Sequence, residues 1–368
     1  MTFFAILTSS HLFDTSKYFN IISNMTVHEI ASLAGVSIGT VDRVIHKRSR
    51  VSPATRAKVE AIIKKYQFTP NPIASGLKRS HPYRFCALLP QRDQDAGYWG
   101  QIIAGIERAA GEIKPLGAET EIIEYDRYDP EAFEKTSAAV CEKKPEGLLF
   151  APIMQKRTRP FVEKISAEKI PFIFVDSDMP ETEPLCVICQ DSFNGGFLAG
   201  RLFHLFAGTV SMPVAVLDTH GDDYNITRRR EGFLSYAEKN GFPVIVQEYS
   251  DYGGGDISAE KITKFLKEHD NLSGLFITNS MAHRAAQAVK QRRKNKPFLL
   301  MGYDLIPSNR QLLLEGHINA IISQRPEEQG REALLTLFRS VTLGQKVEKR
   351  VEIPLDVHIK ENTPPLPL

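Results

Sequence analysis

Residues 26–65 read TVHEIASLAGVSIGTVDRVIHKRSRVSPATRAKVEAIIKK, and this stretch decides the fold of the first domain. Thr26 and Glu29 have the spacing of a capping box, in which the Thr hydroxyl caps the helix start and the Glu carboxylate reaches back. Apolar residues then recur at helical spacing, at Val27, Ile30, Ala31 and Ala34. Because Gly35 follows this apolar stripe, we expect a short helix that ends there.

Two more short helices are expected after this one. Ser37 supplies a second N-cap, and Ser52 with Pro53 supplies the cap and first turn of a third helix. The expected buried faces are Val41, Val44 and Ile45 in the second helix and Val59, Ile62, Ile63 and Tyr66 in the third. Three short helices, the first two joined by a tight glycine turn, are typical of a helix-turn-helix domain.

The charge of the chain is distributed unevenly. Residues 26–80 carry ten Lys or Arg against three Asp or Glu, a net charge of +7, whereas the 368-residue chain carries only +2. Residues 1–24 contribute one of each sign, so residues 81–368 carry −5. A basic end on an acidic body is expected where one end contacts phosphates.

The first domain resembles the head of the lactose-repressor (LacI/GalR) family. The similarity extends from Thr26 to Leu77 and includes the A-G-V-S turn, the T-V-x-R-V helix, the V-S-x-x-T-R start of the third helix and the closing P-N. The resemblance implies that Ile38 and Gly39 face bases in the major groove, with Arg43 nearby. It implies contacts to the DNA backbone from Thr26, Ser37, Thr40, Arg50 and Ser52. The alternative for each polar side chain is a solvated helix face.

One residue departs from the family pattern. Asp42 stands where the family usually has Ser, which brings a carboxylate close to the DNA. It repels phosphate unless it pairs with Arg43 or Lys47, or accepts a hydrogen bond from a cytosine amino group. The sequence leaves these possibilities open.

Residues 70–77 resemble the hinge helix of the family, and we expect 70–82 to form this hinge helix and a linker. The resemblance implies DNA contacts from Asn71 and Ala74, and a minor-groove wedge at Leu77 that unstacks a base step. A flexible linker is the alternative. Met25 directly precedes the first cap, so residues 1–24 are interpreted as a disordered extension or a misassigned start.

Residues 83–360 predict an α/β body. Apolar runs alternate with amphipathic stretches, and they include 85–89, 147–151, 171–175, 213–217, 274–277 and 297–301. Such alternation predicts βαβ units and parallel sheets. The family resemblance implies two periplasmic-binding-protein-like lobes, with crossovers near Gln190, Gln324 and Gly344. The expected first lobe is 83–189 and 325–344, the second is 190–323 and 345–360, and 361–368 form a tail.

Polar residues at the ends of the predicted strands indicate a ligand site, because ligands of open parallel sheets bind there. By family resemblance the ligand-binding residues are Tyr98, Trp99, Asp176, Arg229, Asn279, Asp304 and Gln324. Carboxylate, guanidinium and amide groups suit the vicinal hydroxyls of a sugar, and aromatic faces stack on it. Alternatives are a turn residue at Asp176, a helix cap at Asp304 and a hinge at Gln324. Asn279 is followed by Ser280 where the family has Asp, and Asp93 and Asp95 are weaker candidates.

These observations predict a cytoplasmic transcription regulator, most simply a repressor. Its expected partners are double-stranded operator DNA, a small sugar effector and a second copy of the chain; neither cofactor, metal nor membrane is expected. No run approaches 18 apolar residues, and Cys186 and Cys189 are interpreted as buried thiols in a strand.

The alternative function is a stand-alone sugar-binding transport component, which needs a secretory signal and no basic head. An enzyme is disfavoured because hydrolase, P-loop and zinc-protease motifs are missing, although Asp176 with Asp304 imitates a glycosidase pair.

Overall fold

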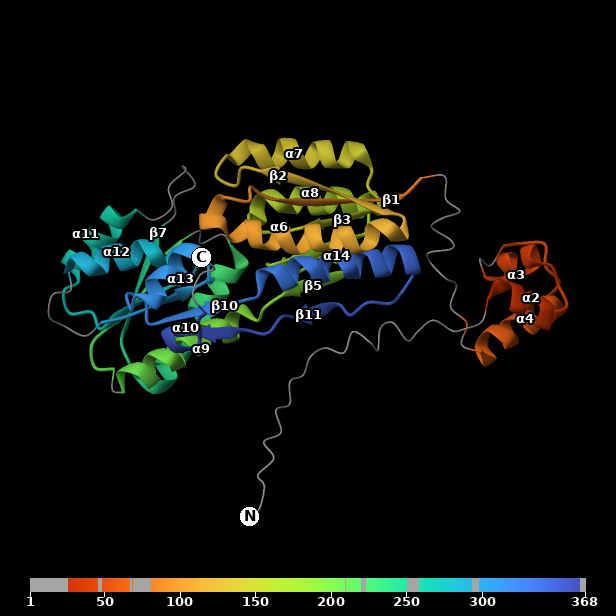
Figure 1. The fold of residues 1–368 in the computed structure, drawn as a ribbon. Helices are drawn as coiled ribbons and strands as arrows, with labels where there is room; N and C mark the ends of the chain where they lie inside the picture. The colour runs from red at the N-terminus through yellow and green to blue at the C-terminus, as the bar shows by residue number, and fades with distance from the viewer. Residues whose placement is uncertain are drawn as a thin grey trace, which may run out of the picture. The chain divides into compact units, whose positions relative to one another are not determined.

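The structure is a computed structural model that describes residues 26–45, 48–66, 68, 81–208, 210–219, 223–249, 258–292 and 298–364. The chain divides into two compact units, residues 1–80 and 81–368, which we call the head and the body (Figure 1). The extension at 1–24 and the hinge candidates Asn71, Ala74 and Leu77 lie outside the described residues. No described helix is long and apolar enough to span a membrane.

The head contains the three expected helices. They are α2 (Val27–Ala34), α3 (Ile38–Ile45) and α4 (Pro53–Lys65). The capping box of α2 is formed, since the Glu29 amide donates to Thr26 Oγ1 at 3.2 Å and the Thr26 amide donates to Glu29 Oε2 at 2.5 Å. Gly35 ends α2 at a φ of 64°, a left-handed conformation that glycine adopts without strain.

A small apolar core holds the head together. Its buried members are Ile30, Ala31, Ala34, Val41, Val44, Val59 and Phe68. The expectation for Tyr66 is wrong, because this side chain is 40% exposed. Helix α4 ends at Lys65, so helical spacing no longer applies beyond it, and Phe68 packs into the core instead.

The body consists of two lobes, each built on one six-stranded sheet. The first lobe contains β1 (Tyr83–Pro90), α6 (Gln94–Ile113), η1 (Lys114–Leu116), β2 (Ala118–Tyr125), α7 (Pro130–Lys143), β3 (Gly147–Phe150), α8 (Gln155–Ala167), β4 (Phe172–Val175), β5 (Cys186–Cys189), α14 (Pro326–Leu343) and β11 (Arg350–Glu352). The second lobe contains α9 (Ser192–Ala207), β6 (Val214–Thr219), α10 (Tyr224–Asn240), β7 (Val244–Tyr249), α11 (Ala259–Glu268), β8 (Gly274–Ile277), α12 (Ala282–Arg292), β9 (Leu299–Tyr303), α13 (Pro307–Leu314), β10 (Ala320–Ser323) and β12 (Asp356–His358); the short helix η2 (Lys360–Asn362) follows β12.

The two sheets have the same strand order pattern. The first runs β11-β5-β4-β3-β1-β2 and the second β12-β10-β9-β8-β6-β7. All described strand pairs are parallel except β12 against β10. This arrangement is the expected pair of α/β lobes.

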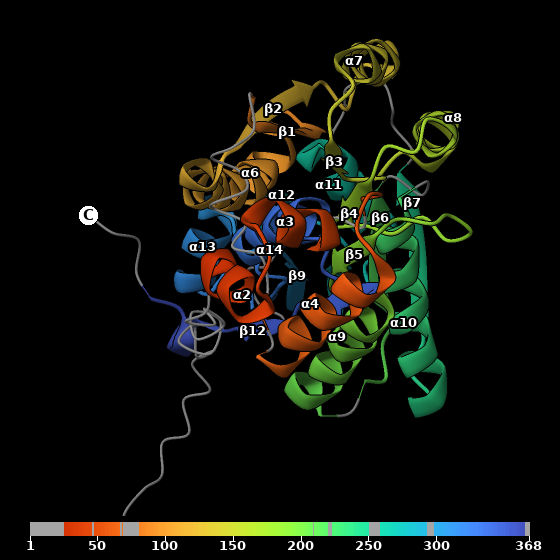
Figure 2. The ribbon, with the colours of Figure 1, turned by 90° about the vertical axis from the view of Figure 1, so that its right-hand side faces the viewer.

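Helices cover both faces of each sheet, which explains the continuous apolar runs of the strands. Successive strand residues point to opposite faces. In β6, Val214 and Val216 pack in the core beneath α9 and α10, whereas Ala215 and Leu217 pack in the core beneath α11 and α12. Figure 2 shows α9 and α10 side by side. A strand buried on both faces reads as an unbroken apolar run rather than an alternating one.

The described chain passes between the lobes at residues 190–191, 324–325 and 353–355. The expected third crossover near Gly344 is wrong, and of the stretch 345–360 that was expected in the second lobe, residues 350–353 belong to the first lobe whereas 356–358 lie in the second. Residues 350–352 pair with β5 as strand β11 of the first sheet, and 356–358 then pair with β10 of the second. Val351 and Ile353 pack in the first core. A three-residue strand is too short to give a periodic signal in the sequence.

In each lobe, glycines allow the backbones of two neighbouring helices to pack in close contact. A Cβ atom at Gly196 of α9 would lie 1.8 Å from the carbonyl oxygen of Arg229, and one at Gly232 of α10 would lie 1.9 Å from the carbonyl oxygen of Phe193. In the first lobe, a Cβ at Gly105 of α6 would lie 2.0 Å from a backbone oxygen of α14. Only residues without side chains allow backbones this close. In the second lobe this contact places α10, and with it Arg229.

Candidate functional site

The candidate DNA surface of the head is formed by helix starts and by α3. Ser37 Oγ accepts from the Thr40 amide at 3.2 Å, and Ser52 Oγ accepts from the Thr55 amide at 3.2 Å. Thr26, Ser37 and Ser52 thus cap the three helices. Each lies at a helix N-terminus, where the helix dipole favours phosphate.

Helix α3 exposes the residues that were expected to face DNA. Ile38 and Gly39 form its first turn, and Ile38 is 39% exposed although it is apolar. Arg43 is exposed in the last turn of α3. Arg50 is exposed in the loop before α4, with a φ of 74°. An exposed isoleucine at the start of a second short helix is consistent with contact to base edges in a groove.

Asp42 forms an ion pair with Arg48, 3.2 Å between Asp42 Oδ2 and Arg48 Nη1. The sequence suggested Arg43 or Lys47 as partners and did not suggest Arg48. Both side chains are largely exposed, at 46% for Asp42 and 64% for Arg48. Such a pair adds little stability, but it compensates one positive charge of the head.

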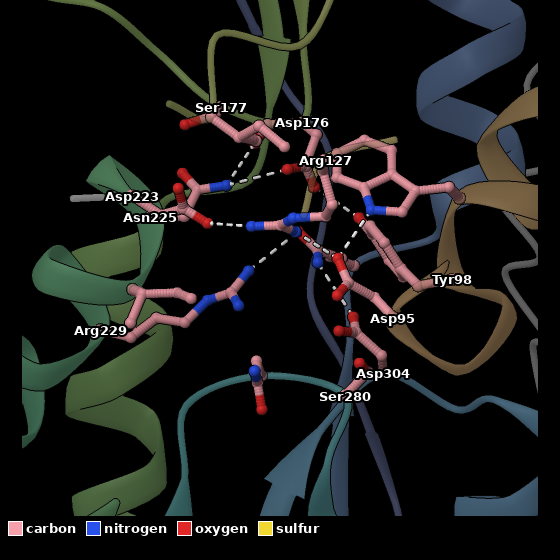
Figure 3. Close-up of a pocket in the computed structure, with 15 residues that line it drawn as sticks. Asp95, Tyr98, Arg127, Asp176, Ser177, Asp223, Asn225, Arg229, Ser280 and Asp304 are labelled. Carbon is pink, nitrogen blue, oxygen red and sulfur yellow. Dashed lines mark hydrogen bonds and ion pairs between the residues drawn. The ribbon is translucent and has the colours of Figure 1, made fainter. Parts of the chain in front are cut away.

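A cavity lies in the body where the two lobes meet, at the carboxyl ends of the strands (Figure 3). Its lining residues come from both lobes and are Asp95, Tyr98, Trp99, Arg127, Ile153, Asp176, Ser177, Asp223, Asn225, Ile226, Arg229, Asn279, Ser280, Asp304 and Gln324. The free volume is about 40 Å³, room for roughly three water molecules. The lobes are therefore closed on a narrow, polar space.

Three carboxylates of the cavity stand on left-handed backbone. Asp95, Asp176 and Asp304 have φ values of 51°, 69° and 66°. The two lobes use the same device: the Asp176 amide donates to Ile188 O at 2.9 Å and the Asp304 amide donates to Ile322 O at 2.8 Å. Each bond joins the end of one strand to its neighbour. Aspartate tolerates this conformation better than most residues, and such backbone is concentrated at functional sites.

Asp95 is the centre of the first-lobe wall. Its carboxylate accepts from Trp99 Nε1 at 2.7 Å, from the Tyr128 hydroxyl at 2.7 Å and from the Arg127 guanidinium. Asp95 and Arg127 are each 7% exposed and Trp99 is 1% exposed. The indole of Trp99 is thus fixed in the wall by a hydrogen bond to a buried charge.

Arg127 also reaches across to the second lobe. Its Nη2 donates to Asp223 Oδ2 at 2.8 Å, and both side chains are 6% exposed. Figure 3 shows Arg127 between Asp95 and Asp223. This ion pair holds the lobes together in the closed cavity. Opening the lobes separates Arg127 from Asp223 but leaves it paired with Asp95.

Asp176 forms a second contact between the lobes. The Tyr98 hydroxyl donates to Asp176 Oδ1 at 2.5 Å within the first lobe. Asn225 of α10 donates its Nδ2 to the Asp176 carbonyl oxygen at 2.6 Å, and its Oδ1 accepts from Ser192 Oγ at 2.9 Å. Asp176 therefore orders side chains on both sides of the cavity.

Arg229 organises the second-lobe wall. Its Nη1 donates to Thr278 O at 2.9 Å and its Nη2 donates to Gln324 Oε1 at 3.1 Å. The guanidinium carbon lies 3.8 Å from the centre of the Tyr303 ring, a cation–π contact. Gln324 in turn donates its Nε2 to Asp304 Oδ1 at 2.9 Å. Gln324 lies at a lobe crossing and also lines the cavity, so both of its suggested roles are compatible with its position.

Burial dominates the proton affinities of the cavity carboxylates. It raises the pKa of Asp223 to about 7 and that of Asp304 to about 7, although Arg127 and Arg229 respectively oppose the shift. Burial also raises the pKa of Asp176, against the hydrogen bond from Tyr98. A buried carboxylate resists ionisation unless it is paired. These groups are therefore sensitive to the charge of whatever enters the cavity.

The structure brings together all seven residues expected to bind ligand, Tyr98, Trp99, Asp176, Arg229, Asn279, Asp304 and Gln324. Asp304 does not cap α13, whose N-cap is Ile306. The sequence analysis missed Arg127, Asp223 and Asn225. All three follow the carboxyl ends of strands β2 and β6, so the rule used for the other residues also applies to them.

Two family models match the chain. The model of bacterial regulatory proteins of the lacI family matches residues 26–71, and the model of the periplasmic binding protein domain matches residues 86–346. The transcriptional regulator DegA of Bacillus subtilis is 27% identical over 352 residues, which cover 93% of this chain and 98% of DegA. The transcriptional repressor PurR of Photorhabdus laumondii is 26% identical over 224 residues, which cover 60% of this chain and 61% of PurR.

Solved structures agree with these matches. A structure from Bacteroides fragilis assigned to the LacI transcriptional regulators has a TM-score of 0.71 and 28% identity, and the match covers 76% of this chain and 98% of that one. GanP, a glucose-galactose binding protein from Geobacillus stearothermophilus, has a TM-score of 0.69 at 22% identity and covers 78% of this chain and 100% of its own; it supports the fold alone. The chain belongs to the LacI family of bacterial transcription regulators, with a helix-turn-helix DNA-binding head and a periplasmic-binding-protein-like body.

Proposed function

We propose that the closed cavity of the body is the effector site, that its effector is a carbohydrate, and that occupancy changes the affinity of the head for operator DNA. The observation that carries this proposal is the convergence of seven sequence-predicted side chains, from both lobes, on one buried polar cavity. Carboxylates, guanidinium groups and amides beside two aromatic rings complement the hydroxyls and apolar face of a sugar.

The narrowness of the cavity explains how binding is linked to movement. About 40 Å³ is too small for a monosaccharide, so a ligand enters only when side chains or lobes move apart. The Arg127–Asp223 ion pair joins the two lobes across this space. We therefore propose that ligand entry disturbs this pair and that the bound and empty bodies differ in lobe geometry. By linkage, a ligand that alters DNA affinity has its own affinity altered by DNA by the same factor.

Trp99 provides the direct test. It is the only tryptophan of the chain, it lines the cavity, and its Nε1 is bonded to Asp95. We expect a sugar that binds to change its emission, because the polarity around the indole changes. The measurement is a fluorescence titration with monosaccharides, repeated with operator DNA present. A sugar that shifts the emission but never changes DNA affinity would contradict the regulatory link.

Arg229 and Arg228 form a matched pair of variants for this titration. Arg229 is 3% exposed and lines the cavity, whereas Arg228, its neighbour, forms an exposed ion pair with Glu231. We expect Arg229→Ala to abolish the fluorescence response and Arg228→Ala to retain it. If Arg229→Ala also retains the fluorescence response, Arg229 does not contribute to ligand binding.

We further infer that the protein acts as a homodimer or larger assembly in the cytoplasm, where its operator DNA lies. One head of three short helices contacts too few base pairs for useful specificity, and family heads bind paired half-sites. Light scattering at micromolar concentration is expected to give at least twice the mass of 41.3 kDa. A strictly monomeric protein that still binds one specific DNA sequence tightly would overturn this inference.

The alternative of a stand-alone transport component is disfavoured by the head itself. A transport component has no use for a basic helix-turn-helix domain.

A further inference from the structure

The described lining of the cavity carries more acids than bases. Four carboxylates, those of Asp95, Asp176, Asp223 and Asp304, surround the guanidinium groups of Arg127 and Arg229. All six side chains are buried, with exposures between 3% for Arg229 and 7% for Asp95 and Arg127. If all ionise, the lining has two negative charges in excess. Uncompensated charge in a buried space is costly.

Both Nη atoms of each guanidinium group already donate to an oxygen of the protein. Arg127 donates one Nη to Asp95 and the other to Asp223. Arg229 donates its two Nη atoms to Thr278 O and Gln324 Oε1 and stacks on Tyr303. A carboxylate or phosphate is bound best by the two-pronged edge of an arginine. Arg229 Nε has no hydrogen-bond partner, so Arg229 keeps a donor for a ligand oxygen.

The unused hydrogen-bonding groups are mainly acceptors and hydroxyls. Within the described part of the chain, Asp223 Oδ1, Ser177 Oγ and Ser280 Oγ are buried without a hydrogen-bond partner, and so is Arg229 Nε. Their residues all line the cavity. Buried polar groups without partners are rare in folded proteins, so these atoms need a partner in the cavity, either water or a ligand. The carboxylate oxygen calls for a donor, Arg229 Nε calls for an acceptor and the two hydroxyls take either, so the ligand needs at least one donor beside Asp223.

From these charges and contacts, and resting on the proposed carbohydrate site, we propose that the effector is a polyhydroxyl compound that carries a protonated amine, such as an amino sugar. An ammonium group donates three hydrogen bonds and accepts none, which matches an acceptor-rich, negatively charged wall. Its hydroxyls meet the serines and Arg229 Nε. The same site rejects sugar acids and sugar phosphates, since they add negative charge beside four buried carboxyl groups.

The number of protons released or taken up on binding gives a second test of the charge of the ligand. Burial raises the pKa of Asp223 and of Asp304 to about 7, so the empty cavity holds bound protons near neutral pH. The other ionisable groups that interact with them include Asp95, Asp176, Arg127, Arg229, Tyr98, Tyr125 and Tyr303. A nearby ammonium lowers carboxyl pKa values, so its binding at pH 7 releases protons. An anionic sugar raises them, and its binding takes protons up.

The test uses the full chain and sugars in matched sets. Glucose, galactose and mannose are each compared with the 2-amino sugar, the uronic acid and the 6-phosphate, by titration calorimetry at pH 7 in phosphate and in MOPS buffer. In at least one set we expect the amino sugar to bind about tenfold or more tightly than the neutral sugar. We expect it to release protons, seen as a buffer-dependent enthalpy, and we expect no measurable binding of the acid or phosphate.

Two variants test which aspartate produces the preference for the amino sugar. Asp223→Asn keeps the size of the side chain and removes its charge, and we expect it to reduce the preference for the amino sugar at least several-fold. Asp218→Asn is the matched control: Asp218 is a buried second-lobe aspartate paired with Arg230, but it does not line the cavity. It should keep the preference. If Asp223→Asn fails to fold, Asp304→Asn replaces it.

The outcomes separate this inference from the proposed function. Tighter binding of a neutral sugar, an acid or a phosphate in every set that binds overturns the amine and leaves the carbohydrate site standing. Proton uptake on binding also overturns it. Binding by none of the sugars overturns both.

Discussion

The head and the body place their functional residues in opposite ways. In the head, the described DNA-contact candidates lie within one stretch from Thr26 to Ser52, on the exposed sides of short helices. In the body, the cavity residues come from segments as distant as Asp95 and Gln324, and all seven expected ligand-binding residues are buried. A DNA groove is a long surface that a helix can contact from outside, whereas a small ligand has to be enclosed. The partner thus determines whether a site is contiguous or assembled.

The two units also differ in how much core supports the site. Among its described residues the head has seven buried apolar core residues, and the body has two sheets with helices on both faces. A domain with few buried residues loses a larger share of its stability with each one. DNA binding should therefore be more sensitive to single core substitutions than ligand binding is.

Ile30→Ala is the largest expected effect and tests this contrast. Ile30 is fully buried in α2, so its truncation costs about 3 kcal/mol and unfolds much of the head. Operator binding should be lost while the Trp99 response to ligand remains. The measurements are thermal unfolding and both titrations. Leu33→Ala, in the same helix but 50% exposed, is the control; an equal loss there would refute the core argument.

Arg43→Ala and Arg50→Ala distinguish residues of the head that read bases from residues that contact phosphates. Arg43 lies on α3 and Arg50 in the loop before α4. We expect Arg43→Ala to lose about 1–3 kcal/mol of discrimination between operator and mismatched sites. Arg50→Ala should weaken all sequences alike and reduce the salt slope of log affinity by about one. Mobility-shift titrations at several salt concentrations distinguish the two, and identical profiles would contradict both roles.

Asp42→Ala is the smallest expected effect. Its loss frees Arg48 from the ion pair, so affinity for every sequence should rise and the salt slope should steepen by about one. If Asp42 instead accepts from a cytosine amino group, the variant loses preference for one base pair. Binding assays on operators changed one position at a time separate these two results.

Much of the molecule could be predicted from sequence because its signals are local. The capping box at Thr26 and Glu29, the glycine end at Gly35 and the apolar strand runs depend on residues close to one another in the chain. The predictions failed where local signals ended. Tyr66 lies one residue beyond α4, and β11 is only three residues long.

The sequence by itself determined the order of the elements, the basic head and the residues at the strand ends, since each follows from neighbours in the chain or from composition. The tertiary structure alone decided which of those residues share a buried space. Arg127 and Asp223 are 96 residues apart and pair only because two lobes close on each other. The raised pKa of Asp223, to about 7, likewise follows from burial. Burial and long-range pairing depend on how distant segments pack, and no local pattern encodes that.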